Sequence, residues 1–269
     1  WSLTNLIRQF CDEFEVLIPS KAHSSGTLIS LGANTIIMTK QATLGPIDPS
    51  LNSPLNPQNP QVPNNPQARL PVSVESIKGY FELAKKDLQI KDTQSIANIL
   101  IGLSNQVHPL VLGDVYRSRT QIQMLARKLL SKQIKDKKSI DKIIAFLCSD
   151  SGSHDYTIYR REAKEELGLN IEKPDDDFYQ LIKDTFTNIQ NELELKKAFD
   201  PNMILGTNSQ MNYSCRRALI ESIAGGTDVF VSEGTLLRNN QIISQGPNLP
   251  PIQRVVIEDQ RKFEGWKHE

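Results

Sequence analysis

Hydrophobic and polar positions alternate between helical and extended periods at the start of the chain. Residues 1–13 carry apolar side chains at helical spacing, and residues 14–20 form a short apolar run. Residues 26–33 predict a small-residue helix that ends near Gly32, and residues 34–40 predict a second strand rich in β-branched side chains. Strand, helix and strand at this spacing predict a βαβ-type unit with a mainly parallel sheet.

Helical periodicity dominates the middle of the chain. Ser73 is the expected N-cap of a helix that continues to about residue 90. The last part of the chain differs, because two strands around a Gly225-Gly226 turn and a hairpin closed by Asn239-Asn240 are predicted there. Further helices are expected at residues 93–107, 112–134, 139–148, 160–169 and 175–199.

Residues 46–71 are dense in proline and asparagine. Proline lacks a backbone donor and fixes φ, so this segment is neither regular helix nor central strand. It is long for a loop inside a compact domain. Two interpretations stay open: an excursion over the surface that touches a neighbouring subunit, or a disordered linker.

Composition narrows the class of protein. The 269 residues include 31 basic and 31 acidic side chains, so the balanced charge gives no reason to expect a nucleic-acid partner. The three cysteines have no metal-type spacing, and their odd number suits a reducing compartment. No apolar run is long enough to cross a bilayer.

Because the chain starts at Trp1 without Met, we expect that an N-terminal segment is missing. We expect a cytoplasmic protein, or one that the missing segment attaches to a membrane.

Two serines and a glycine stand where the first predicted strand gives way to the helix. A serine at a helix N-terminus usually caps free backbone N–H groups with its hydroxyl. The same turn can instead expose the serine oxygen beside backbone N–H groups and the positive helix end, which suits attack on a carbonyl. Gly26 adds no side chain to obstruct that approach. Local spacing leaves both roles of Ser24 open.

Two ordered motifs carry a family resemblance. Residues 22–29 have the order Ala-x-Ser-Ser-Gly-Thr-Leu-Ile, and residues 44–49 have the order Leu-Gly-Pro-Ile-Asp-Pro. These segments resemble the nucleophile segment of the serine dehydrogenase proteinase family, in the Clp protease/crotonase superfamily, and signal peptide peptidase A carries a similar one. By this resemblance Ser24 matches the nucleophile, and the N–H of Ser25, before Gly26, matches an oxyanion donor.

A later segment resembles the part of Clp proteases in which an aspartate orients the catalytic histidine. Asp155 precedes Glu162-Ala163 by seven residues, the interval found in that motif. The resemblance implies an α/β Clp protease/crotonase-like fold with a parallel-rich sheet and flanking helices over residues 1–170. Residues 171–269 are then expected to form a C-terminal helix and β-hairpin extension.

The general base is the open part of the prediction, because a serine hydroxyl is a weak nucleophile without one. The histidine that follows the serine in Clp proteases is absent, since Asp48-Pro49 stands in that region. His108, at a predicted helix start, completes a Ser24–His108–Asp155 triad. A Ser24–His154 dyad is the alternative, and a capping or surface role remains open for both histidines.

Lysines are weaker candidates for the base. Signal peptide peptidase A uses a lysine, but no motif in this chain fixes an equivalent one. We interpret Lys78, Lys85 and Lys86 as a solvated helix face, because a lysine must lose its water shell to act as a base near neutral pH. His23 neighbours Ser24, but adjacent side chains on a turn usually diverge.

The sequence therefore predicts a serine hydrolase that cleaves peptide bonds through an acyl-enzyme on Ser24, without a metal or an organic cofactor. By resemblance, its partners are a peptide or protein substrate and further copies of the chain. The alternative is an inactive scaffold or partner-binding module of the same fold. It is favoured by the missing histidine and by the lack, before Ser24, of the Gly-Gly pair that gives relatives a second oxyanion donor; Gly225-Gly226 lies far downstream. Acyl-CoA chemistry is a weaker third reading.

Overall fold

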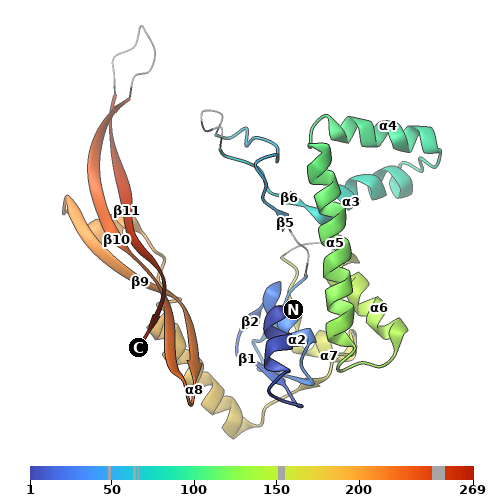
Figure 1. The fold of residues 1–269 in the computed structure, drawn as a ribbon, viewed down its shortest axis with the longest axis horizontal. Coiled ribbons are helices and arrows are strands. Elements are labelled where there is room, and N and C mark those ends of the chain that lie inside the picture. Colours follow the sequence, from blue (N-terminus) through green and yellow to red (C-terminus); the bar gives the residue numbers. More distant parts are fainter. Residues whose placement is uncertain (48–49, 63–64, 66, 151–154, 244–251) are drawn as a thin grey trace. The chain divides into compact units, whose positions relative to one another are not determined.

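The computed structural model describes residues 1–47, 50–62, 65, 67–150, 155–243 and 252–269 (Figure 1). The chain divides into two compact units, Trp1–Tyr179 and Gln180–Glu269. Each unit is described separately below.

A parallel sheet forms the centre of the first unit. Strands β1 (Glu15–Ile18), β3 (Thr35–Met38) and β8 (Ile171–Glu172) are neighbours in the order β1-β3-β8, and both pairings are parallel. Helix α2 (Ser25–Leu31) connects the first two strands, together with the short strand β2 (Lys21–Ala22). The predicted strand–helix–strand unit and its parallel pairing are confirmed.

A second small sheet adjoins the helix start. Strand β2 pairs in parallel with β4 (Thr43–Leu44), and β4 pairs in antiparallel fashion with β7 (Ile158–Tyr159). The β7 strand leads directly into helix α7 (Arg160–Glu165). Segments separated by more than one hundred residues therefore meet beside the N-terminus of α2.

Helices bury the apolar side chains of this sheet region. Helix α5 (Pro109–Leu130) packs against α2 and α6 (Lys137–Ala145), and α1 (Ser2–Ile7) and the π-helical turn η2 (Phe146–Asp150) complete the set. Asp136 caps α6 by accepting from the Ser139 N–H, so this helix begins earlier than the predicted start at Ser139. The core includes Leu31, Ile36, Met38, Leu44, Leu130, Ile143, Leu147 and Ile158.

The proline-rich segment is closed at its ends. Strand β5 (Ser50–Leu51) pairs with β6 (Val72–Ser73) in antiparallel fashion. The buried Asn56 holds the two arms, because its Nδ2 donates to the carbonyl oxygens of Leu51 at 2.6 Å and Leu70 at 2.9 Å. The described residues of the segment therefore form an excursion that is closed by its own hydrogen bonds.

A helical lobe follows the excursion (Figure 1). It comprises α3 (Val74–Glu82), the π-helical turn η1 (Leu83–Asp87), α4 (Thr93–Ser104) and the first half of α5. Ser73 is the N-cap of α3, as predicted, because its Oγ accepts from the N–H groups of Glu75 and Ser76. A small separate core of valines joins α3 to α5: Val72, Val74, Val107, Val111 and Val115.

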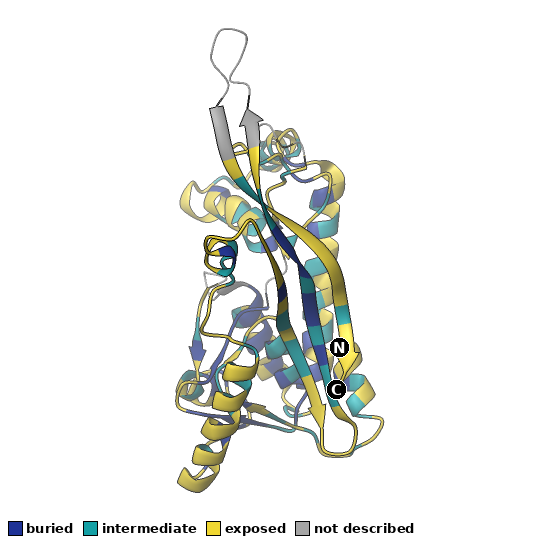
Figure 2. Ribbon diagram, turned by 90° about the vertical axis from the view of Figure 1, so that its left-hand side faces the viewer, coloured by how far each residue is buried: buried dark blue, intermediate teal, exposed yellow. Residues whose placement is uncertain are grey.

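The second unit contains an antiparallel sheet. Its strands are β9 (Gln210–Ser222), β10 (Gly226–Ile243) and β11 (Ile252–His268), with β10 in the centre. Figure 2 shows that buried residues run along the middle of β10. Helices α8 (Asp176–Glu192) and α9 (Pro201–Leu205) precede the sheet.

One predicted turn in this unit is wrong. Asn239 and Asn240 pair with Val256 and Val255 inside the β10–β11 ladder, so they do not close a hairpin.

The predicted domain boundary after residue 170 falls just before β8, and β8 pairs with β3 in the first unit. Within the part of the chain that the structure describes, no single helix is both long and apolar enough to span a membrane.

Candidate active site

Ser24 occupies a strained turn between β2 and α2. Its backbone has φ 50° and ψ −106°, in the positive-φ region that side-chain-bearing residues rarely adopt. Such conformations cost about 1–3 kcal/mol and cluster at functional sites, where the surrounding structure holds them. A serine on a sharp strand-to-helix turn is the geometry that exposes a nucleophilic Oγ at the end of a sheet.

The Ser24 side chain does not serve as a helix cap. Ser24 stands at the N-cap position of α2, but its hydroxyl accepts no capping hydrogen bond, and the residue is exposed. The sequence left two roles open for Ser24, that of a helix cap and that of a nucleophile. The structure does not show the helix cap. The exposure of the residue leaves room for a substrate carbonyl to approach.

A buried threonine braces the turn from below. The Thr27 hydroxyl lies 2.8 Å from the carbonyl oxygens of both Ala22 and Gly45, and the Gly45 N–H donates to it at 3.1 Å. Thr27 is fully buried. One side chain thus connects the residues before Ser24, the helix after it and the strand end at Gly45, which fixes the strained conformation.

Two glycines make this packing possible. A Cβ on Gly26 would lie 3.1 Å from the Cβ of Ala22, and a Cβ on Gly45 would lie 2.9 Å from the Cγ of His23. Both distances are shorter than ordinary van der Waals contact between carbon atoms. The glycines of the two motifs therefore allow the turn and the β4 end to approach each other closely.

His23 turns toward β4. Its Nε2 lies 3.0 Å from Thr43 Oγ1, and its ring packs over the backbone of Gly45. The imidazole therefore stacks against the neighbouring strand, in line with the expected divergence of His23 and Ser24.

The backbone around Ser24 offers one donor to an oxyanion. The Gly26 N–H donates to the His23 carbonyl at 2.9 Å, whereas no described residue accepts a hydrogen bond from the Ser25 N–H. Gly225 lies in the turn after β9, and Gly226 is the first residue of β10.

Asp155 lies at the same end of the small sheet as Ser24. In the antiparallel pairing Ile158 faces Leu44, so residues before Ile158 run alongside residues after Leu44. In the parallel pairing Ala22 faces Leu44, so residues after Ala22 extend in the same direction. The end that carries Ser24 therefore also carries the exposed Asp155. His154, Asp48 and Pro49 lie outside the described residues.

The structure does not bring His108 to Ser24 within one chain. The Nδ1 of His108 accepts from the Leu110 N–H, so this histidine caps α5. Helix α5 meets α2 at its other end, where Gln133 Nε2 donates to the Leu31 carbonyl. Since a helix rises about 1.5 Å per residue, the length of α5 separates His108 from that contact by roughly 30 Å.

Some site residues were not among the predicted ones. Thr27 and Gly45 shape the turn, and Thr43 contacts the imidazole of His23. Their signal in the sequence was their membership in the two motifs that carry the family resemblance. Motif membership indicates that a residue matters, but it does not say which contact it makes.

Comparison with known proteins gives a family match for the N-terminal part of the chain. The model of the ClpP-like SDH-type serine proteinase family matches residues 2–76. Two uncharacterised proteins of Methanocaldococcus jannaschii are similar: one is 29% identical over 60% of this chain and 44% of its own length, the other 27% identical over 58% and 41%. The chain thus spans less than half the length of these relatives. No solved structure matches.

The family match covers the turn that carries Ser24. It includes the strained serine, Gly26, the Thr27 brace and the β4 end at Gly45. Residues 2–76 of this chain are therefore similar to the ClpP-like SDH-type serine proteinase family.

Proposed function

We propose that the protein is a serine peptidase that acts through an acyl-enzyme on Ser24. The observation that carries the proposal is the positive-φ conformation of Ser24, combined with an exposed hydroxyl that makes no capping hydrogen bond. A strained conformation persists only where the surroundings enforce it, and the Thr27 brace is such an enforcement. The family match supports the choice of a peptidase among serine hydrolases.

The chemistry follows that of other serine hydrolases. A base removes the proton from Ser24 Oγ, and the oxygen forms a bond to the scissile carbonyl carbon. The carbonyl oxygen becomes an oxyanion that the Ser25 N–H is placed to bind. When the C–N bond breaks, the base returns the proton to the leaving amine. Water then attacks the Ser24 ester and releases the acid.

The base belongs to the segment that contains Asp155 in this proposal. Asp155 lies at the sheet end that carries Ser24, and His154 precedes it directly in the sequence. His108 acts as the base only if a second copy of the chain supplies it, because α5 holds it away from Ser24 within the chain.

The inactive scaffold remains the second candidate. The observation in its favour is that no imidazole or amine among the described residues hydrogen-bonds to Ser24 Oγ. A scaffold of this kind keeps the strained turn but has no general base to accept the proton of the serine hydroxyl.

Labelling of the full-length protein with a fluorophosphonate probe separates these candidates. The peptidase predicts a covalent adduct on Ser24 that disappears in Ser24→Ala and persists in Ser25→Ala, because Ser25 contributes its backbone N–H. An unlabelled Ser24 in a protein with a native thermal transition supports the scaffold and contradicts the peptidase.

Histidine variants then identify the base. His154→Ala is expected to lower the labelling rate by about 10²–10⁴-fold, the usual contribution of a general base. His108→Asn is the matched variant, since asparagine preserves the N-cap of α5. Its labelling is expected to remain at the parent rate; a loss in His108→Asn with retention in His154→Ala would assign the base to His108 of another copy.

A further inference from the structure

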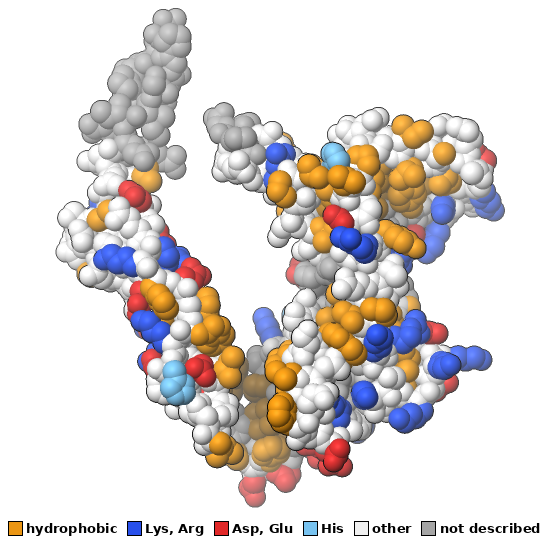
Figure 3. All heavy atoms as spheres, in the orientation of Figure 1, with side chains coloured by type: hydrophobic (Ala, Val, Ile, Leu, Met, Phe, Trp, Pro, Cys, Tyr) orange, Lys and Arg blue, Asp and Glu red, His pale blue; other side chains and the backbone are white. Residues whose placement is uncertain are grey.

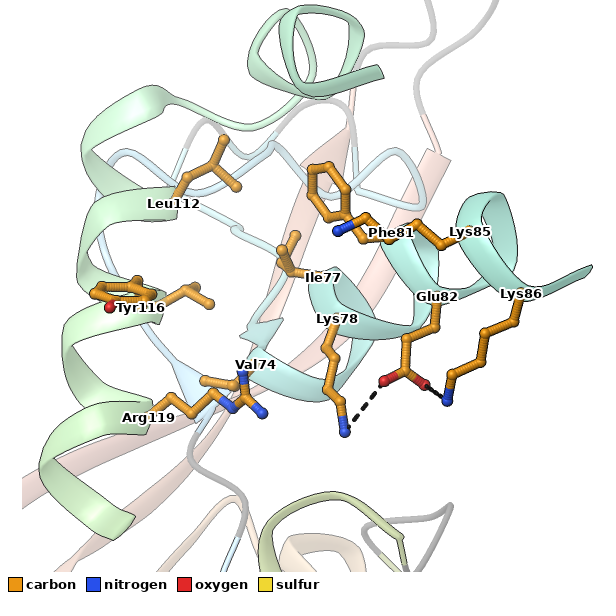
Figure 4. Close-up of a pocket in the computed structure, with 11 residues that line it drawn as sticks. Val74, Ile77, Lys78, Phe81, Glu82, Lys85, Lys86, Leu112, Tyr116 and Arg119 are labelled. Atoms are coloured by element: carbon orange, nitrogen blue, oxygen red, sulfur yellow. Dashed lines mark hydrogen bonds and ion pairs between the residues drawn. The ribbon is translucent and has the colours of Figure 1, made fainter. Parts of the chain in front are cut away.

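A cavity of about 510 Å³ lies between two helices of the helical lobe, apart from the Ser24 turn (Figure 4). Helix α3 contributes Val74, Ile77 and Phe81, and helix α5 contributes Leu112 and Val115. The volume falls within the roughly 300–1,000 Å³ that is typical of small-molecule sites, and an apolar lining with a few polar groups is their usual composition.

Four cationic side chains surround this apolar lining, but only one carboxylate does. The cations are Lys78, Lys85, Lys86 and Arg119, and the carboxylate is Glu82. Glu82 is shared, because it pairs with Lys78 at 3.4 Å and with Lys86 at 3.2 Å. Glu75, which is not part of the lining, also pairs with Lys78 at 3.9 Å. The cavity therefore has an excess of positive charge after these pairs are counted.

Lys85 and Arg119 have no acidic partner among the residues that the structure describes. The Nε of Arg119 is shielded from solvent and makes no hydrogen bond. In Figure 4 the Arg119 side chain extends from α5 toward Val74 at the start of α3. Arg119 therefore brings to the cavity wall a positive charge that no described carboxylate pairs with.

An irregular helical turn positions two of the lysines. In η1 the Leu88 N–H donates to the Leu83 carbonyl at 3.0 Å, a hydrogen bond that spans five residues. Such π-helical turns are frequent at functional sites. Lys85 and Lys86 both belong to this turn and are exposed, as expected for a solvated helix face.

The surface around the cavity has the same mixed character. Tyr116 at the cavity and Leu83 in η1 are exposed. Figure 3 shows hydrophobic side chains gathered over the helical lobe, with lysine and arginine side chains beside them. An aliphatic chain that leaves the cavity would thus continue over apolar surface.

We propose that this cavity binds an anionic amphiphile, with an aliphatic chain against the valine, isoleucine and phenylalanine side chains and an acidic head group on Arg119 and Lys85. The oxygens of a carboxylate or phosphate accept charge-assisted hydrogen bonds from arginine and lysine side chains, and both types line this cavity. A neutral amphiphile fills the apolar part but leaves the two cations unpaired. A cationic one meets like charge.

The test is a titration of the full chain with dodecanoate below its micelle concentration, followed by calorimetry. Dodecanol and dodecyltrimethylammonium are the matched neutral and cationic probes, and dodecyl phosphate tests whether both acidic heads are accepted. Dodecanoate is expected to bind at least about tenfold more tightly than dodecanol, as a charge-assisted hydrogen bond implies. Equal affinities for dodecanoate, dodecanol and dodecyltrimethylammonium would overturn the proposal.

Variants locate the binding. Arg119→Met and Lys85→Met keep much of the side-chain volume and are expected to weaken dodecanoate binding by about tenfold each while leaving dodecanol binding unchanged. Lys132→Met, on an exposed residue outside the cavity, is the control and should bind like the parent chain. Equal binding in all three variants would contradict the site.

A second experiment distinguishes binding in the cavity from binding to a membrane surface. The protein is sedimented with phosphatidylglycerol vesicles and, separately, with phosphatidylcholine vesicles. Sedimentation with phosphatidylglycerol in the absence of any binding of free dodecanoate or dodecyl phosphate would show a surface interaction and overturn the cavity proposal.

Discussion

The Thr27 hydroxyl contacts both the N–H and the carbonyl oxygen of Gly45. The Gly45 N–H donates to Thr27 Oγ1 at 3.1 Å, and the Gly45 carbonyl oxygen lies 2.8 Å from the same hydroxyl. Because the Ala22 carbonyl lies at 2.8 Å as well, this one oxygen connects both sides of the strained Ser24 turn to the end of β4. The turn is therefore a property of tertiary packing and not of the local sequence alone.

Removal of this hydroxyl tests the connection. Thr27→Val keeps the side-chain shape but leaves buried Gly45 and Ala22 groups without a partner, so the free energy of unfolding should fall by about 1–3 kcal/mol. We also expect the labelling of Ser24 by a fluorophosphonate to fall, since the turn loses its brace. Urea unfolding and labelling rates measure the two effects.

Thr39→Val is the matched control for that variant. Thr39 is also buried, and its hydroxyl donates to the Pro19 carbonyl at 2.9 Å. It should destabilise the chain by a similar amount, yet Ser24 labelling of the folded protein should persist. Equal losses of labelling in the two variants would mean that stability, and not the turn geometry, controls reactivity.

Relief of the backbone strain is a second prediction. Glycine adopts positive φ without steric cost, so Ser24→Gly should leave the free energy of unfolding unchanged or raise it by up to about 1 kcal/mol. Ser25→Gly is the matched variant at the first helical position, and it should lower that free energy by about 0.5–1 kcal/mol. Urea titrations of both chains give the comparison. A clear loss of stability in Ser24→Gly would show that the serine is not strained.

Gly45→Ala tests the contact between β4 and His23. The added Cβ would lie 2.9 Å from His23 Cγ, so the variant should lose about 1–3 kcal/mol of stability through overpacking. In a His23→Ala background the same change should cost less, because the ring is gone. A double-mutant cycle measures the coupling, expected at about 0.5–3 kcal/mol; independent effects would contradict the packing.

The second unit should respond to acid through Asp259. A hydrogen bond from Tyr213 Oη at 2.6 Å, with further contributions from Arg261, lowers the pKa of the Asp259 carboxyl. A carboxyl with a lowered pKa adds stability that is present above its unfolded value of about 3.9 and is lost as the pH falls through the folded value. Asp259 should therefore contribute to the acid sensitivity of this unit below about pH 4.

Asp259→Asn is the variant that measures this contribution. It should be less stable than the parent at neutral pH, and the difference should shrink as the pH falls from about 5 toward 2. Trp266 fluorescence in a Trp1→Phe background reports on the second unit, because Trp266 belongs to β11. Asp177→Asn, an exposed residue of α8, serves as the control. A constant difference between parent and Asp259→Asn across this range would contradict the assignment.

Local signals in the sequence were sufficient where neighbouring residues determine the structure. The cap at Ser73 and the strand–helix–strand unit around α2 were predicted from short-range patterns, because capping and periodicity are local. The start of α6 was missed, since Asp136 and Ser139 are both good N-cap residues and spacing alone does not rank them.

Long-range contacts explain what the local patterns could not predict. Asn239-Asn240 is a favourable turn sequence, but the β10–β11 ladder extends past it and overrides the local preference. The position of His108 depends on the length and packing of α5, and the cavity beside α3 depends on two helices far apart in sequence. None of these contacts can be predicted from the residue type at one position of the sequence.

The most direct test of the account is acyl-enzyme trapping on Ser24. The full-length protein is mixed with an activated acyl ester, the release of the alcohol is followed in time, and the acylated residue is mapped by peptide mass spectrometry. We predict a rapid burst of about one equivalent per competent chain, with the acyl group on Ser24 and no burst in Ser24→Ala. A folded parent protein that shows no burst, or an acyl group on any other residue, would contradict the account.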